Sequence, residues 1–175
     1  MAAGEGKRLR PYTNDCPKCM VSIEGETLID RQLSVLKHPD IETIIIVAGY
    51  MIHMLEGKGD ILIENPRYSE TNMVSTLFCA EDYLSGDVIV SYGDIVYPKS
   101  VLNALLKSNA DISVIIDKEW KDYWSARSDN PLDDAETLRL NDNGTIAEIG
   151  QKPISTDEIE GQYIGLMKFS ARGAD

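Results

Sequence analysis

Apolar and polar positions along this chain follow two different periodicities, and these predict its helices and strands. Residues 27–36 carry apolar side chains at 28, 29, 33 and 36, which is the spacing of an amphipathic helix. Similar spacing occurs in 72–84, and 100–107 follows a proline that suits a first helical turn. Short runs typical of buried strands lie between these segments, at 41–48, 60–65, 87–92 and 111–116. We therefore expect strands and helices to alternate, with a mostly parallel sheet covered by helices on both faces.

The pattern changes in the last part of the chain. Residues 137–140 and 145–149 flank the turn 141–144, and together they predict a β-hairpin. Residues 161–169 predict one further strand. The length of 175 residues favours one domain, 1–175, with a sizeable core.

Charge and composition exclude several classes of protein. The net charge of −12 argues against nonspecific nucleic-acid binding. No apolar run reaches the length of a membrane span and no signal peptide is visible, so we expect a cytoplasmic protein without a membrane partner. Cys16 and Cys19 form a single C-x-x-C pair, and with Cys79 they are interpreted as reduced thiols rather than a zinc or redox site.

The first residues stand out against this acidic background. Gly4 and Gly6 allow a sharp turn that approaches an anion closely, and cations follow at Lys7, Arg8, Arg10 and Lys18. Backbone N–H groups with Arg and Lys side chains suit a polyphosphate. The segment matches neither a Walker A loop nor a dinucleotide fingerprint, because Leu9 replaces the third glycine of the latter.

Both ends of the chain predict an incomplete domain. A phosphate loop usually follows a buried strand, and only residues 1–3 precede this one. At the other end, the chain stops at Asp175, directly after the strand-like run 161–169.

Asp94 is the second candidate for chemistry. It follows the predicted strand 87–92, so its carboxylate lies at the carboxyl edge of the sheet, where open α/β sheets bind ligands. A carboxylate there can hold Mg²⁺ against nucleotide phosphates. The alternative is a solvated aspartate in a turn.

The loop 2–11 together with Pro17 and Lys18 resembles the signature of the nucleotidyltransferase superfamily that includes sugar-1-phosphate nucleotidylyltransferases. Residues 65–77 and 91–97 resemble a CTP-using branch, the bacterial phosphocholine and aminophosphonate cytidylyltransferases. Over the whole chain, the resemblance implies a Rossmann-like, three-layer α/β/α sandwich with the hairpin as a small β excursion. It also implies a reaction in which CTP and a small phosphorylated or phosphonylated acceptor give a CDP-linked product and pyrophosphate.

The resemblance assigns roles on the nucleotide side. Arg8 would hold the β- and γ-phosphates, Lys18 would stabilise charge at the α-phosphate, and Asp94 would bind Mg²⁺. The nucleotide-binding positions that it implies are Ala3, Gly4, Gly6, Arg8, Asn72 and Ser75. For Asn72 and Ser75, helix capping on a solvated face is an equal alternative. The family usually adds a second metal carboxylate from a later strand, and no match to it precedes Asp175.

The acceptor side is predicted from residues 117–160. Trp120 and Trp124 lie among carboxylates, an arrangement that suits a cationic head group, although the rings could equally pack on the sheet. Lys152 precedes a proline and resembles the family's second lysine, which binds the acceptor phosphate. Glu160 resembles a position that faces the acceptor.

Two other functions remain open from the sequence. A sugar-1-phosphate nucleotidylyltransferase that uses UTP, GTP or dTTP would have the same loop chemistry. A nucleotide-binding domain without turnover would explain the unmatched second carboxylate. The expected partners are CTP and the acceptor, and a homo-oligomer is one open alternative for the assembly state.

Overall fold

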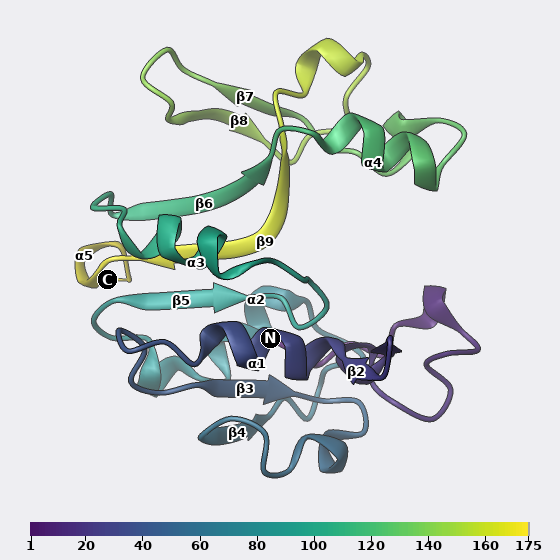
Figure 1. Cartoon of the computed structure of the whole chain (residues 1–175), viewed down its shortest axis with the longest axis vertical. Coiled ribbons are helices and arrows are strands. Elements are labelled where there is room, and N and C mark those ends of the chain that lie inside the picture. The colour runs from purple at the N-terminus through teal and green to yellow at the C-terminus, as the bar shows by residue number, and fades with distance from the viewer. Residues whose placement is uncertain (175) are drawn as a thin grey trace. The chain divides into compact units, whose positions relative to one another are not determined.

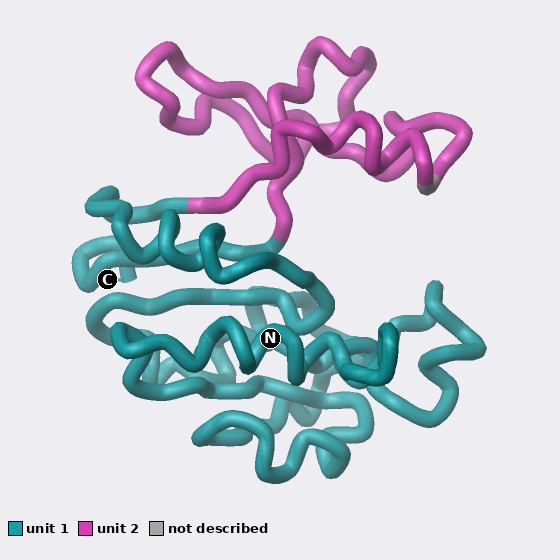
Figure 2. Tube along the Cα trace, in the orientation of Figure 1, with its two compact units in different colours: residues 1–113, 165–175 teal, residues 114–164 magenta. Residues whose placement is uncertain are grey.

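The computed structural model describes residues 1–174 of the protein and shows two compact units. Unit 1 contains residues 1–113 and the segment that starts at Gly165, and unit 2 contains Val114–Ile164 (Figure 2). The phosphate-loop and Asp94 candidates therefore lie in unit 1, whereas the candidates for the acceptor side lie in unit 2.

Unit 1 has the alternating elements that the sequence predicts (Figure 1). Its strands are β1 (Ser22–Ile23), β2 (Glu26–Thr27), β3 (Ile45–Ala48), β4 (Ile61–Glu64) and β5 (Val88–Ser91). Its helices are α1 (Leu28–Leu36), α2 (Met73–Phe78), α3 (Lys99–Leu106) and α5 (Ala171–Ala174). Short 3-10 turns are η1 (Lys7–Leu9), η2 (Lys18–Met20), η3 (Ile52–Leu55) and η4 (Glu81–Tyr83). Figure 1 shows α1 in front of these strands and α2 behind them, so unit 1 has three layers.

The strands of unit 1 combine parallel and antiparallel pairs. β3 and β4 are parallel, with Ile45 opposite Ile61, and Ala2 forms a parallel bridge with Ala48. β1 and β2 form a small antiparallel pair. β5 pairs antiparallel with β9 (Gln162–Phe169), and β9 also borders β6 (Ile112–Asp117). β6 and β9 each continue from one unit into the other.

The element boundaries depart by more than one residue from the sequence prediction at two elements of unit 1. The strand predicted over 41–48 starts at Ile45, because the ladder with β4 begins there and the Ile44 N–H instead donates to the Asp60 carboxylate over 2.7 Å. The helix predicted over 72–84 divides into α2 and η4, since the Ala80 N–H turns back to the Leu77 carbonyl.

The main core of unit 1 lies between α1 and β3. Ile29 and Leu33 of α1 pack with Ile46 and Ala48 of β3. Ala2, Cys19 and Leu55 complete this buried cluster. The amphipathic stripe of residues 28–36 thus covers the sheet directly beside the N-terminal loop, which fixes the ends of that loop to a rigid base.

Unit 2 contains the predicted hairpin and a small core of its own. Its elements are α4 (Trp120–Arg127), β7 (Leu138–Leu140), β8 (Ile146–Ile149) and the 3-10 turns η5 (Pro131–Asp133) and η6 (Thr156–Glu158). β7 and β8 are antiparallel, with Leu138 opposite Ile149. Within residues 1–174, no helix is both long and apolar enough to cross a membrane.

Candidate nucleotide-binding site

The N-terminal loop is anchored at its start and exposed beyond it. Ala2 and Ala3 are buried, and the Ala2 N–H donates to the Val47 carbonyl over 2.7 Å. The Ala3 carbonyl accepts from the Tyr50 N–H. Gly4, which follows directly, is exposed, and a Cβ atom there would meet nothing within 4 Å. The backbone that would face a phosphate is therefore open to solvent but is held by β3.

Gly6 brings the loop against Lys18. It has a left-handed conformation, φ 68°, and a Cβ atom at this position would lie 3.0 Å from Cβ of Lys18 and 3.0 Å from Cγ2 of Thr13. Thr13 is fully buried, and its hydroxyl donates to the Gly6 carbonyl over 2.8 Å. Only glycine fits both the backbone angle and the space, so this close approach depends on it.

Lys18 and Asp94 form an ion pair in unit 1. Lys18 follows the buried Pro17 at the start of η2, and Asp94 follows β5. The Lys18 side chain is 38% exposed and that of Asp94 is 27% exposed. The structure therefore brings the two main chemical candidates of the sequence together, although 76 positions separate them, and leaves both reachable from solvent.

Gln32 holds the backbone on both sides of Asp94. Its side chain is buried, at 3% exposed, and its Nε2 donates to the carbonyls of Tyr92 and Ile95, each over 2.6 Å. Gly93 lies inside this span, and its own N–H donates to the Met1 carbonyl. The position of the Asp94 loop is thus set by α1 and by the start of the chain.

The other basic residues of the loop lie on the surface. Lys7, Arg8 and Arg10 are exposed. Lys7 lies 3.4 Å and Arg10 3.5 Å from the Glu5 carboxylate. Such exposed pairs contribute little to stability, about 0–1 kcal/mol, so these side chains can turn toward an anionic ligand at little cost.

Asn72 and Ser75 lie at the start of α2. The Asn72 side chain accepts a hydrogen bond from the Ser75 N–H over 3.0 Å, and both residues are exposed. The helix cap that the sequence left as an alternative is therefore present. Behind them, the buried Asn65 donates to the hydroxyls of Thr71 and Thr76, which fixes the approach to α2.

Within unit 2, Lys152 and Glu160 hold backbone groups. The exposed Lys152 ammonium donates to the carbonyls of Leu132 and Asp133, over 2.5 and 2.8 Å. The Glu160 carboxylate accepts from the Leu140 N–H over 2.6 Å. Both side chains stay at the surface, so an acceptor could compete for them.

The two tryptophans of unit 2 differ in burial. Trp120 is 4% exposed, packs with Ala135 and Ile159, and donates from its indole N–H to the Ile159 carbonyl. Trp124 is half-buried and meets the Trp120 ring edge to face, with ring centroids 6.3 Å apart. Trp120 therefore has the packing role that the sequence left open, and its ring is enclosed by the core of unit 2.

A metal at this site would depend on Asp94. Within residues 1–174, no group of three or more His, Cys, Asp or Glu side chains is arranged to hold an ion. Mg²⁺ commonly binds proteins through one or two carboxylates and completes its shell with substrate phosphates and water. A single half-buried carboxylate beside a phosphate loop fits that chemistry for a metal that arrives with the nucleotide.

Cys19 of the C-x-x-C pair is part of the core. Its thiol is 2% exposed, and burial raises its pKa to about 11. All three cysteines are free thiols. A thiol so strongly protonated is a poor nucleophile and metal ligand, and Cys19 instead packs under the loop that carries Lys18.

Comparison with protein families gives one match that covers most of the chain. Residues 1–146 match the MobA-like NTP transferase domain. The chain belongs to the MobA-like NTP transferase family. The matched region of this NTP transferase includes the glycine loop of residues 4–6, the Lys18–Asp94 pair and Gln32.

Comparison with individual proteins also finds nucleotidyltransferases. The NTP transferase is 44% identical to the CTP:phosphoglutamine cytidylyltransferase of Campylobacter jejuni, over 97% of this chain and 71% of that protein. It is 30% identical to the choline-phosphate cytidylyltransferase of Streptococcus pneumoniae, over 62% and 49% of the two chains. The structure of the inositol-1-phosphate CTP transferase from T. maritima superposes with a TM-score of 0.75 at 24% identity, over 98% of this chain and 69% of that one. The last likeness confirms the predicted α/β fold class.

Sequence reasoning did not identify Thr13 or Gln32. Gln32 could have been recognised in the sequence, because it lies on the apolar stripe of α1 next to Leu33, where a polar residue is unexpected. No pattern in the sequence indicates the role of Thr13, because its burial depends on how residues 6–18 fold back on themselves.

Proposed function

We propose that this protein is a cytidylyltransferase that joins CTP to a small phosphorylated amide or amine and releases pyrophosphate. The 44% identity to the phosphoglutamine enzyme, over nearly the whole chain, is the observation that carries the proposal. The geometry of unit 1 supports it, because an open glycine loop, a lysine and a carboxylate meet at one edge of the sheet.

In this mechanism the nucleotide would bind along the N-terminal loop. Backbone N–H groups near Gly4 and Gly6 would cradle the phosphates, and Arg8 would bind the β- and γ-phosphates. The Lys18 ammonium would turn from Asp94 toward the α-phosphate, where negative charge builds up as the acceptor oxygen attacks in line with the leaving pyrophosphate.

The acceptor needs no general base, since its phosphate or phosphonate oxygen is already anionic. Catalysis then consists of positioning and charge stabilisation. Asp94 would hold Mg²⁺, which when bound neutralises phosphate charge. Asn72 and Ser75 stay proposals for nucleotide contacts. Lys152, Glu160 and Trp124 stay proposals for the acceptor, whereas Trp120 is better explained by packing.

Pyrophosphate release tests the proposed function. The protein with Mg²⁺ would be offered each of CTP, UTP, GTP and dTTP with phosphoglutamine, phosphocholine, an aminoalkylphosphonate and glucose 1-phosphate. We expect release with CTP and a phosphorylated amide or amine. Release only with another nucleotide and the sugar phosphate would move the protein to the sugar-1-phosphate branch. Tight nucleotide binding without release from any pair would favour a binding domain.

Gln32→Met is expected to lower turnover by loosening the Asp94 loop. The change keeps the size of the side chain but removes both donors to the Tyr92 and Ile95 carbonyls. Each lost hydrogen bond costs about 0.5–1.5 kcal/mol, so thermal stability should fall as well. The Tyr92 carbonyl still accepts from the Ser91 hydroxyl over 3.3 Å, so the Ile95 carbonyl is the one affected more. The decisive measurement is the Mg²⁺ concentration for half-maximal turnover, taken at a temperature well below the melting temperature of the variant. We expect this concentration to be higher in Gln32→Met than in the wild type.

Leu33→Val is the matched control for that variant. Leu33 is buried on the same helix but packs into the core rather than against the Asp94 loop. We expect it to lose stability without changing the Mg²⁺ requirement. An unchanged Mg²⁺ requirement in Gln32→Met would contradict the positioning role.

A further inference from the structure

Glu5 places a carboxylate inside the loop that is expected to bind phosphates. It lies between Gly4 and Gly6, and its side chain is 18% exposed. The cations that follow are more exposed, with 69% of the Lys7 side chain and 51% of the Arg10 side chain open to solvent. A carboxylate in this place repels phosphate and offsets part of the positive charge of the loop.

The local backbone directs two cations onto this carboxylate. Gly6, with φ 68°, turns the chain into η1, and the Arg10 N–H donates to the Lys7 carbonyl at its end. A 3-10 helix has about three residues per turn, so Lys7 and Arg10 lie one turn apart on the same side. The Lys7 ammonium and the Arg10 guanidinium contact the same atom, Oε2 of Glu5, over 3.4 and 3.5 Å.

These contacts have the character of a ligand that can be exchanged. Carboxylates and phosphates both accept charge-assisted hydrogen bonds from lysine and arginine, and strong bonds of this kind are about 2.7–2.9 Å long. The contacts of Glu5 are longer, and both of its cations are open to solvent. A polyphosphate has more charge and more acceptor oxygens than one carboxylate, so it can take both cations from Glu5.

The same arrangement is present next to Glu5 in the site. Lys18 borders Gly6 and pairs with Asp94, just as Lys7 and Arg10 pair with Glu5. Three cations of the loop region are therefore matched by carboxylates before any nucleotide binds. Binding of a polyphosphate exchanges one anion for another, which lowers the net gain in free energy and favours release.

We propose that Glu5 is an internal competitor for polyphosphate at Lys7 and Arg10. The inference rests on the proposed function, in which a triphosphate enters the loop and pyrophosphate leaves it. The incoming phosphates displace the Glu5 carboxylate from the two cations, and the carboxylate returns to them when pyrophosphate departs. Glu5 thereby lowers the affinity for pyrophosphate and limits inhibition by this product.

Inorganic pyrophosphate is the probe, and calorimetry measures its binding without acceptor, in the presence and absence of Mg²⁺. Glu5→Gln keeps the size of the side chain and removes the charge. We expect the Kd for pyrophosphate to fall by about 3- to 10-fold in both conditions, the effect of removing two partly exposed ion pairs that compete with the ligand. The inhibition constant of pyrophosphate in turnover should fall by a similar factor.

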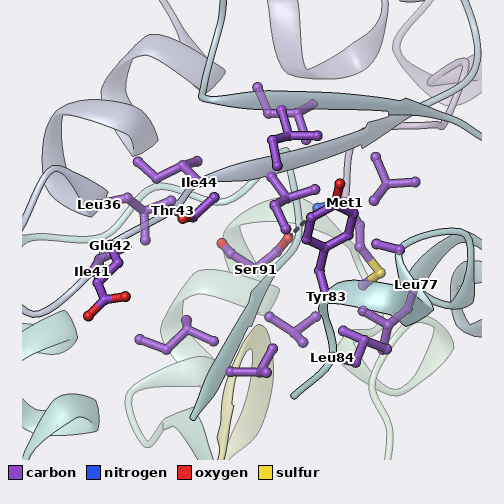
Figure 3. A pocket seen from close by; sticks show the side chains of 18 of the residues that line it. Met1, Leu36, Ile41, Glu42, Thr43, Ile44, Leu77, Tyr83, Leu84 and Ser91 are labelled. Atoms are coloured by element: carbon purple, nitrogen blue, oxygen red, sulfur yellow. Dashed lines mark hydrogen bonds between the residues drawn. The ribbon is translucent and has the colours of Figure 1, made fainter. Parts of the chain in front are cut away.

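Glu42→Gln is the matched control, because it removes the same charge at a distance from the loop. Glu42 is exposed and precedes β3, whereas the glycine loop follows the pairing of Ala2 with Ala48 at the other end of that strand. Figure 3 shows Glu42 well apart from Met1, near which the loop begins. We expect the Kd for pyrophosphate to stay at the wild-type value in this variant.

A second background separates competition at the cations from repulsion through space. Lys7→Gln with Arg10→Gln removes both partners of Glu5 and should weaken pyrophosphate binding. Adding Glu5→Gln to this background should change the Kd by less than about twofold, since the competing pairs are already absent. An equal gain from Glu5→Gln with and without the two cations would overturn the proposal.

The remaining outcomes are also decisive. Pyrophosphate binding that is unchanged or weaker in Glu5→Gln overturns the role of Glu5, and weakening only in the presence of Mg²⁺ would make Glu5 a metal ligand instead. Tighter pyrophosphate binding in Glu5→Gln, in a protein that joins CTP to no acceptor, would support the competitor and reject the proposed reaction. Transfer from CTP with unchanged pyrophosphate binding in Glu5→Gln would do the reverse.

Discussion

Lys18→Ala is expected to lower turnover by about 100- to 1,000-fold, the usual effect of removing one group that stabilises charge in a transition state. Lys18 lies beside Asp94 and against Gly6, so its ammonium is placed to reach a phosphate bound on the glycine loop. The proposed reaction has no general base whose loss could dominate. The Lys18 charge should therefore be the largest contribution that a single side chain makes.

The fold should survive this change. The Lys18 side chain is 38% exposed, and a half-exposed ion pair contributes about 0–1 kcal/mol, or a few degrees of melting temperature. Alanine also keeps the Cβ atom that borders Gly6. Steady-state kinetics with CTP and the best acceptor, together with a melting curve, would measure both effects.

Lys107→Ala is a suitable control for Lys18→Ala. Lys107 is exposed at the end of α3 and is not one of the candidate site residues. We expect wild-type turnover in this variant. Turnover within about threefold of wild type in Lys18→Ala would remove Lys18 from the mechanism, whereas equal losses in both variants would point to a general effect of charge.

Asp94→Asn is expected to have the second large effect, a loss of turnover of about 100-fold or more with a weaker response to Mg²⁺. Asparagine keeps the size and the oxygen atom but removes the charge that attracts the metal. The same change removes the partner that holds Lys18 in place before substrate binds. Titration of CTP binding with and without Mg²⁺ measures the metal effect separately from turnover.

A double variant shows whether the two residues act as a unit. The double variant carries both Lys18→Ala and Asp94→Asn. If Lys18 and Asp94 stabilise the same transition state, its fold-loss of turnover should be smaller than the product of the fold-losses of the two single variants. Asp142→Asn, an exposed change in the turn between β7 and β8, should leave both measurements unchanged. Mg²⁺ that strengthens CTP binding equally in wild type and Asp94→Asn would exclude Asp94 as the metal ligand.

Local patterns predicted most elements because each depends on nearby residues. The stripe at 28, 29, 33 and 36 buries one face of α1, with Leu36 at its end. The β-branched run before Gly93 forms β5 within one residue of the predicted limits at each end. Boundaries shifted where a distant group decided them, as at Ile44, whose N–H is bound by Asp60.

The spacing of glycines, cations and strand ends in the sequence was enough to predict the family, which the family match confirms. The same spacing predicts a phosphate loop and roles for Lys18 and Asp94, and these stay predictions. Only the tertiary structure decided that Lys18 faces Asp94, that Gln32 holds the Asp94 loop, and that Trp120 is enclosed in a core. Such facts depend on contacts between residues far apart in the chain, and burial and pairing at that range are set by packing rather than by local pattern.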